Sequence, residues 1–195
     1  MRDHVDELIK IMPPPAKPLW SEGDWAEIEA RLGLTFPSDY RRYIAAYGAG
    51  GISSNVCFVG YLTVVSPFEP AEDGSRLLPK YSAILVEQLK SYFEDGMFDT
   101  RPLLYPEPGG FFPVASTGDH HYIGWKTAGE PDDWDVMVFT TNLFKFDELP
   151  GTSLSKLFLD LLGHTSPVFE EMNIMAPENF ATRAFFPREL NSGTA

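Results

Sequence analysis

The sequence predicts an α+β fold in which several helices pack against an antiparallel β-sheet. Three β-prone runs follow one another at residues 111–115, 122–126 and 136–140, separated by glycine, proline and acidic turn residues. Segments whose apolar residues recur at helical spacing precede and follow this group. Strands that are grouped together, instead of alternating with helices, are typical of an antiparallel sheet with helices packed against it.

A short amphipathic helix is predicted at the N-terminus. Its apolar residues at helical spacing are Val5, Leu8, Ile9 and Met12. The prolines at positions 13–15 and 18 stop any helix and form a stiff, extended linker. We therefore assign residues 1–18 to an N-terminal helix and linker, which pack either on the main domain or on a second copy of the chain.

Two helices joined by a tight turn are predicted next. Ser21 and Asp24 have the spacing of a capping box at the start of the first helix. Gly33 follows the last apolar residue of that helix, where the chain usually needs a left-handed conformation. Pro37 suits the first position of the second helix, and Asp39 places a carboxylate on its first turn. The second helix ends in a glycine cluster, which leads into a strand: Gly48, Gly50 and Gly51.

The remaining elements are predicted from the same signals. Residues 56–65 are rich in Val, Phe and Tyr and predict a strand or one arm of a hairpin. One helix flanked by irregular loops is expected within residues 66–110. Thr152 is predicted to cap a last helix, which Gly163 ends. The main domain is thus assigned to residues 19–165. The tail, 166–195, is expected to pack on it, because it is too aromatic for a free end.

The charge of the chain narrows its partners. Asp and Glu number 28 against 15 Lys and Arg, a formal charge of −13, which disfavours direct nucleic-acid binding and favours basic protein partners. Taken alone, the charge is explained as well by solubility. The sequence has no apolar run long enough for a membrane span and no signal peptide at its start. The single cysteine, Cys57, is expected to be a small buried hydrophobe, and we expect the chain in the cytoplasm.

No catalytic group, metal site or cofactor is predicted. Asp119, His120 and His121 resemble a metal-binding motif, but such a site needs further carboxylates at matched positions, so turn and strand roles are favoured. His4 and His164 have no nucleophile or carboxylate at catalytic spacing. The glycine cluster follows a helix, and so it cannot present phosphate to a helix N-terminus.

Two acidic groups are the candidate contact sites. Glu94, Asp95 and Asp99 form the first group. The second group consists of Glu130, Asp132, Asp133 and Asp135, which surround Trp134. Solvated loop charge is the simpler interpretation of both groups. The sharper hypothesis is an acidic protein-binding surface in which Trp134 is an exposed anchor, whereas burial of Trp134 against the sheet would make it a core residue.

The region of the two helices resembles the signature of the SUKH superfamily, which includes fungal regulators of cell-wall synthesis and many bacterial immunity proteins. The matching residues are Trp25, Ile28, Glu29, Leu32, Gly33, Phe36, Pro37, Asp39, Tyr40, Gly50 and Gly51. Weaker matches follow in the family's order, at residues 112–119, 134–138 and 154–163. The resemblance extends over residues 20–164.

This resemblance implies a non-catalytic binding domain whose function lies in its variable surfaces. In bacterial members it implies an immunity protein that neutralises a cognate polymorphic toxin, often a nuclease or a deaminase. Such a toxin is expected to be basic where it meets phosphate, in keeping with the acidity of this chain. A regulatory or scaffold protein of the fungal type is the alternative, and an enzyme is a third hypothesis, ranked last. The oligomeric state is left open.

Overall fold

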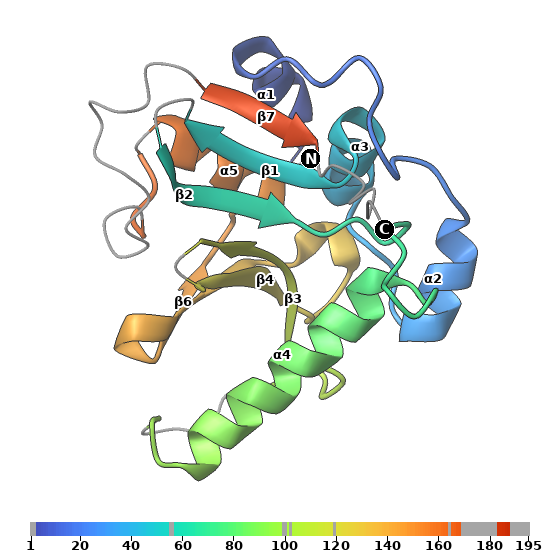
Figure 1. Cartoon of the computed structure of the whole chain (residues 1–195). Coiled ribbons are helices and arrows are strands. Elements are labelled where there is room, and N and C mark those ends of the chain that lie inside the picture. Colours follow the sequence, from blue (N-terminus) through green and yellow to red (C-terminus); the bar gives the residue numbers. More distant parts are fainter. Residues whose placement is uncertain are drawn as a thin grey trace, which may run out of the picture.

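An antiparallel sheet forms the centre of the computed structural model, which describes residues 3–54, 57–98, 101, 103–118, 120–163, 165–168 and 183–187, with no side-chain description for 53–54, 57–61 and 183–187. Within these residues seven strands pair in the order β6-β5-β4-β3-β2-β1-β7, each antiparallel to its neighbours (Figure 1). The strands are β1 (Gly50–Ser54), β2 (Cys57–Val64), β3 (Phe111–Thr117), β4 (Tyr122–Lys126), β5 (Val136–Thr140), β6 (Lys145–Leu149) and β7 (Arg183–Pro187).

Five α-helices accompany this sheet in the described part of the chain. They are α1 (Val5–Ile11), α2 (Trp25–Leu32), α3 (Ser38–Tyr47), α4 (Leu77–Glu94) and α5 (Leu154–Gly163). Two short 3-10 helices, η1 (Pro131–Asp133) and η2 (Thr141–Leu143), flank β5. The predicted α+β fold of several helices on an antiparallel sheet is confirmed. None of the described helices combines the length and the apolar character that crossing a membrane requires.

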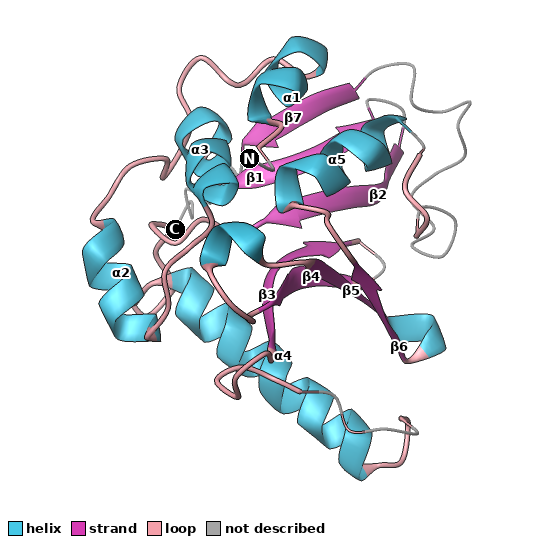
Figure 2. Ribbon diagram, turned by 180° about the vertical axis from the view of Figure 1, so that it is seen from behind, coloured by secondary structure: helices cyan, strands magenta, loops and turns pink. Residues whose placement is uncertain are grey.

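The sheet has two buried faces, as the alternation of its side chains shows. Ile123 and Val138 belong to the larger hydrophobic core, together with residues of α1, α3 and α5. Tyr122 and Phe139, their neighbours along the same strands, belong to a second core with Leu89 and other residues of α4. Because successive strand residues point to opposite faces, α4 covers the face opposite to α3 and α5. Figure 2 shows α1, α3 and α5 on one side of β1, β2 and β7.

An aromatic group fills the larger core, with Trp125 at its centre. Trp125 is 1% exposed. Its ring lies edge-on to Tyr40 at 5.2 Å and is parallel to that of Phe112 at 6.3 Å. Phe36, from the turn before α3, completes the contacts at 6.2 Å. The motif between α2 and α3 is thus held directly on β3 and β4.

The helix ends differ from the sequence predictions in three places. Asp24 alone caps α2, its carboxylate accepting from the N–H groups of residues 26 and 27, whereas the Ser21 hydroxyl donates to the carbonyl of residue 18. Pro37 precedes α3 as its cap residue, so the helix begins one residue later than predicted. Ser153, not Thr152, accepts at the start of α5, from the N–H of residue 156. Gly33 ends α2 at φ 69°, as predicted.

The three consecutive strands predicted from residues 111–140 are present as β3, β4 and β5. Strand β6 was not predicted, because its sequence KFDEL is mostly charged, a composition common at sheet edges. The strand predicted at 56–65 is β2, and β7 from the tail pairs with β1. The predicted burial of Cys57 lies outside the described side chains.

Candidate partner-binding surfaces

The first acidic group lies at the far end of α4. Glu94 is the last residue of the helix and Asp95 follows it, and both side chains are exposed. Figure 1 shows this end of α4 projecting away from α2 and α3. The third member of the group, Asp99, lies outside the described residues. Neither Glu94 nor Asp95 forms an ion pair with a described residue.

The second acidic group is built on η1, which lies against α3. Glu130, Asp132 and Asp133 are exposed there. The Asp132 carboxylate accepts a hydrogen bond of 2.6 Å from the backbone N–H of Ser38, the first residue of α3. Asp132 therefore satisfies a backbone N–H group that would otherwise have no hydrogen-bond acceptor at the N-terminus of α3. This gives it a structural role that does not depend on a partner.

Trp134 is a core residue, and the hypothesis of an exposed aromatic anchor is wrong. Its side chain is 7% exposed and its ring lies 6.1 Å from that of Trp125. Its indole N–H donates to the carbonyl of Gly129 at 3.1 Å, so the one polar atom of the ring is satisfied. The residue lies two positions before β5, at the end of η1, and its side chain joins the larger core.

The structure does not bring the two acidic groups together. The second group lies on η1, beside α3. Glu94 and Asp95 lie at the C-terminal end of α4, and Figures 1 and 2 show this end projecting away from α3. Most described cations are already neutralised in ion pairs, namely Arg41, Arg42, Arg76, Lys80, Lys90, Arg101, Lys126, Lys145 and Lys156.

The two neighbouring histidines have different environments. His120 is exposed in a left-handed conformation (φ 62°), while His121 is 2% exposed and its Nδ1 accepts from the N–H of Thr141. Asp119 lies outside the described residues. Among the residues that the structure does describe, no group of three or more His, Cys, Asp or Glu side chains is placed to hold a metal ion.

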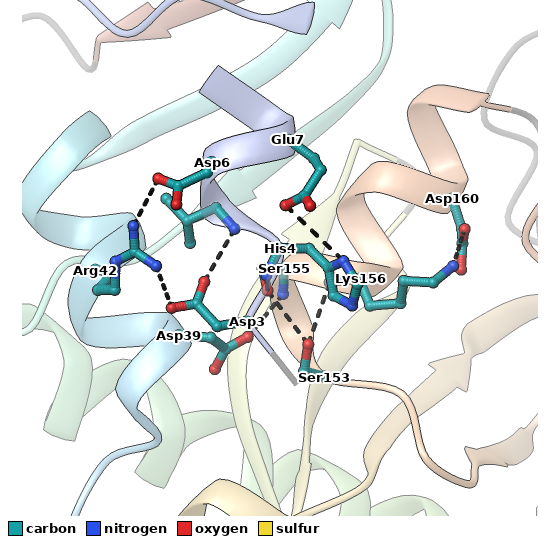
Figure 3. A network of polar contacts seen from close by, with 11 residues as sticks. Asp3, His4, Asp6, Glu7, Asp39, Arg42, Ser153, Ser155, Lys156 and Asp160 are labelled. Carbon is teal, nitrogen blue, oxygen red and sulfur yellow. Dashed lines mark hydrogen bonds and ion pairs between the residues drawn. The ribbon is translucent and has the colours of Figure 1, made fainter. Parts of the chain in front are cut away.

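A network of polar contacts joins α1, α3 and α5, with Asp39 and Ser155 as its buried members (Figure 3). Asp39, 4% exposed, accepts from the backbone N–H of Ser155 at 2.9 Å and so caps the start of α5. The Ser155 hydroxyl in turn accepts from the backbone N–H of His4. Arg42 forms ion pairs with Asp3 and Asp6, which fix the start of α1 on α3. This network is structural, because each group is used to hold one helix on another.

Burial raises the pKa of Asp39, while hydrogen bonds from Ser155 partly oppose the shift. A carboxyl whose pKa is raised by folding stabilises the fold below its ordinary pKa of 3.8, and this contribution is lost as the pH rises through the folded value. The free energy of unfolding should therefore fall as the pH rises through the folded pKa of Asp39. Asp39→Asn, in which the side chain has a similar shape and does not titrate, is expected to remove this fall. Urea unfolding at a series of pH values measures the effect.

The control for the Asp39 prediction is Glu72→Gln, which removes an exposed carboxylate. This variant is expected to keep the pH profile of the original chain. Parallel profiles for Asp39→Asn and the original chain would show that Asp39 contributes nothing to the pH dependence of stability.

Most residues of the α2–α3 motif have structural partners. Glu29 accepts from the backbone N–H of Phe36 at 2.8 Å and forms an ion pair with Arg41. The Tyr40 hydroxyl donates to the carbonyl of Val65 at 2.6 Å. Burial raises the pKa of Tyr40 well above its usual value, so the hydroxyl stays neutral. These residues of the motif therefore serve to build the fold.

Comparison with models of known protein families identifies the family of this chain. The model of the SMI1/KNR4 family (SUKH-1) matches residues 20–160, which include the α2–α3 motif, α4 and the strands β1 to β6. The chain belongs to this family. The resemblance inferred from the sequence motifs is thus confirmed. No curated protein and no solved structure matches the chain.

Two elements of this SUKH-1 chain lie outside the matched residues. They are α1, which packs on α3 and α5, and β7, which pairs with β1. The side chains of Val5 and Leu8 on α1, and of Met12 just after it, are at most 1% exposed. The Tyr47 hydroxyl donates to the carbonyl of Met12 at 2.7 Å and fixes the end of α1. The N-terminal helix thus contributes to the core of the SUKH-1 domain.

Proposed function

We propose that this SUKH-1 chain is a non-catalytic protein-binding domain that acts as an immunity protein. It binds a cognate bacterial toxin with a basic active surface, such as a nuclease or a nucleic-acid deaminase, and neutralises it. The observation that carries the proposal is the family membership over residues 20–160. The immunity role is the one that the resemblance implies for bacterial members, and it places the chain in the cytoplasm, where such a toxin would act.

The charge of the chain supports a basic partner. The formal charge is −13, and most of the described cations are held in ion pairs, whereas Glu94, Asp95 and Glu130 form no ion pair with a described residue. A nuclease or deaminase must be positive where it binds phosphate. An acidic protein that covers such a surface is attracted to it over distance and competes with the nucleic acid.

The proposal is tested by purifying the tagged chain from its native cells at low and at high salt and identifying any stoichiometric partner. We expect a basic toxin domain whose activity disappears at one equivalent of this chain. The affinity of the purified pair is expected to fall by about tenfold or more between low and high salt, because salt screens the attraction between opposite charges.

Three outcomes would contradict parts of this proposal. A stoichiometric partner that is a signalling or structural protein without toxic activity would replace immunity by the regulatory or scaffold function of the fungal type. An affinity that does not change with salt would leave immunity in place but would disprove the electrostatic account of recognition. A toxin that keeps its full activity in the complex would disprove neutralisation.

A further inference from the structure

A group of half-buried aromatic rings lies between the far end of α4 and the turn that joins β5 to β6. The ring of Phe98, just after α4, lies 6.1 Å from that of Phe144 and 5.9 Å from that of Phe146. Tyr92 from α4 meets Phe144 edge-on at 5.5 Å. The fully buried Phe139 lies beneath them, 4.9 Å from Phe146. These rings form the outer edge of the second core.

Two aliphatic side chains extend this aromatic group into solvent. Met97 is 49% exposed and Leu143 is 53% exposed. They are the sequence neighbours of Phe98 and Phe144, whose rings lie 6.1 Å apart, so the four residues belong to one region of the surface. Scattered exposed apolar residues are ordinary, but a continuous patch around half-buried rings is typical of an interaction site.

The backbone of this patch is strained. Phe144 has φ 46° and ψ 47°, a left-handed conformation that is a true outlier for a bulky residue. Such conformations persist only where the surrounding structure enforces them, and they cluster at functional positions. Here it ends η2 and directs the chain into β6, with the Phe144 ring on Tyr92 and Leu143 exposed beside it.

The charges around the patch are acidic on balance. Lys90 pairs with Glu87, and Lys145 pairs with Asp147, so these cations are compensated. Glu94 and Asp95 form no ion pair with a described cation, and they lie at the end of α4, three and two residues before Met97. A partner that fits this patch must therefore bring positive charge together with apolar side chains.

We propose that Met97, Phe98, Leu143 and Phe144, bordered by Glu94 and Asp95, form the surface on which a basic protein partner docks. We call this surface the α4-tip patch. It takes a partner segment that presents Lys or Arg beside aliphatic or aromatic side chains. The partner's apolar side chains pack on the aromatic rings, and its Lys or Arg side chains lie over the ring faces or form ion pairs with the two carboxylates. The proposal rests on the proposed function in that the partner is the basic toxin.

The test uses the full-length chain with the photo-crosslinking residue benzoylphenylalanine in place of Leu143. The matched control carries it in place of Ile84, which is 58% exposed on the side of α4 away from the rings. Irradiation in the native cells is expected to yield one adduct with a basic protein from position 143 and none from position 84. A partner that co-purifies in equal amount but forms no adduct at position 143 would overturn the proposal, as would an acidic adduct.

The second step measures the affinity of the purified pair. Met97→Ala/Leu143→Ala is expected to weaken binding by about tenfold or more, because it removes the exposed apolar contacts. Glu94→Gln/Asp95→Asn is expected to reduce the association rate and the salt dependence. The controls Ile84→Ala and Glu22→Gln/Glu72→Gln, which change exposed residues elsewhere, are expected to stay within about twofold. Equal effects in patch and control variants would disprove the patch.

The failure of this proposal is distinguishable from that of the proposed function. A toxin that is neutralised at one equivalent but binds the patch variants unchanged would leave immunity in place and disprove the patch. A basic protein without toxic activity that crosslinks at position 143 and is sensitive to the patch variants would support the patch and disprove immunity. Thermal unfolding of each variant excludes loss of fold as the cause.

Discussion

Trp125→Ala is expected to lower the free energy of unfolding by about 3–5 kcal/mol. Trp125 is 1% exposed, and its ring contacts Phe36 from the turn before α3, Phe112 from β3 and Trp134 before β5. Truncation removes the ring that these separate segments share and leaves a cavity that rigid strands on either side cannot fill. Because a domain of this kind is stable by only about 5–15 kcal/mol, the variant is expected to be near the limit of folding.

Urea unfolding followed by circular dichroism measures the effect of Trp125→Ala. The control is Ile84→Ala, which truncates a residue that is 58% exposed and is expected to change stability by less than about 0.5 kcal/mol. A loss below about 1 kcal/mol for Trp125→Ala would show that the surrounding aromatic residues close the cavity, and that Trp125 is not the centre of the core.

Gly48→Ala is expected to destabilise the chain by more than about 3 kcal/mol, for two reasons that add. The residue has φ 70° and ψ −153°, a combination that only glycine adopts without strain. A Cβ atom at this position would also lie 2.1 Å from the carbonyl oxygen of Leu19. That oxygen accepts the backbone N–H of Ala49 at 2.8 Å, so a displacement of Leu19 would break the contact between the N-terminal linker and the end of α3.

Gly96→Ala is the matched control for the Gly48 prediction. Gly96 also has a left-handed conformation (φ 74°), but a Cβ atom there would meet no other atom within 4 Å. Its cost is expected to be the conformational strain alone, about 1–2 kcal/mol. Thermal unfolding of both variants separates the two contributions. If Gly48→Ala lowered the free energy of unfolding by no more than Gly96→Ala, the close approach of Leu19 would contribute nothing to the destabilisation.

The parts of the fold that were predicted correctly depend on local sequence. The left-handed end of α2 at Gly33 and the three strands between residues 111 and 140 follow from turn chemistry and β propensity within a few residues. Local signals also predicted α4 inside a segment rich in proline and glycine. The exact caps were less accurate, because Ser, Thr and Asp compete for the same donors at neighbouring positions.

The parts that were missed depend on distant contacts. Asp39 was predicted to serve the start of its own helix, yet its carboxylate reaches the N–H of Ser155, 116 residues away. Trp134 lies among acidic turn residues, and only the tertiary structure shows that its ring is buried. The sequence placed Glu94 and Asp95 in an exposed segment, and they are exposed, but the aromatic rings beside them come from elements that lie about 50 residues apart in the chain.

The pairing of β7 with β1 has a consequence for the synthesis of this protein. Strand β1 pairs with β2 on one side, and on the other with residues 183–187, more than 130 positions later in the chain. While the ribosome is still making the intervening segment, β1 has an open edge with unpaired backbone N–H and C=O groups. Such an edge is a template for wrong pairing with other chains. The edge of β1 therefore stays open to such pairing until residues 183–187 have been synthesised and can pair with it.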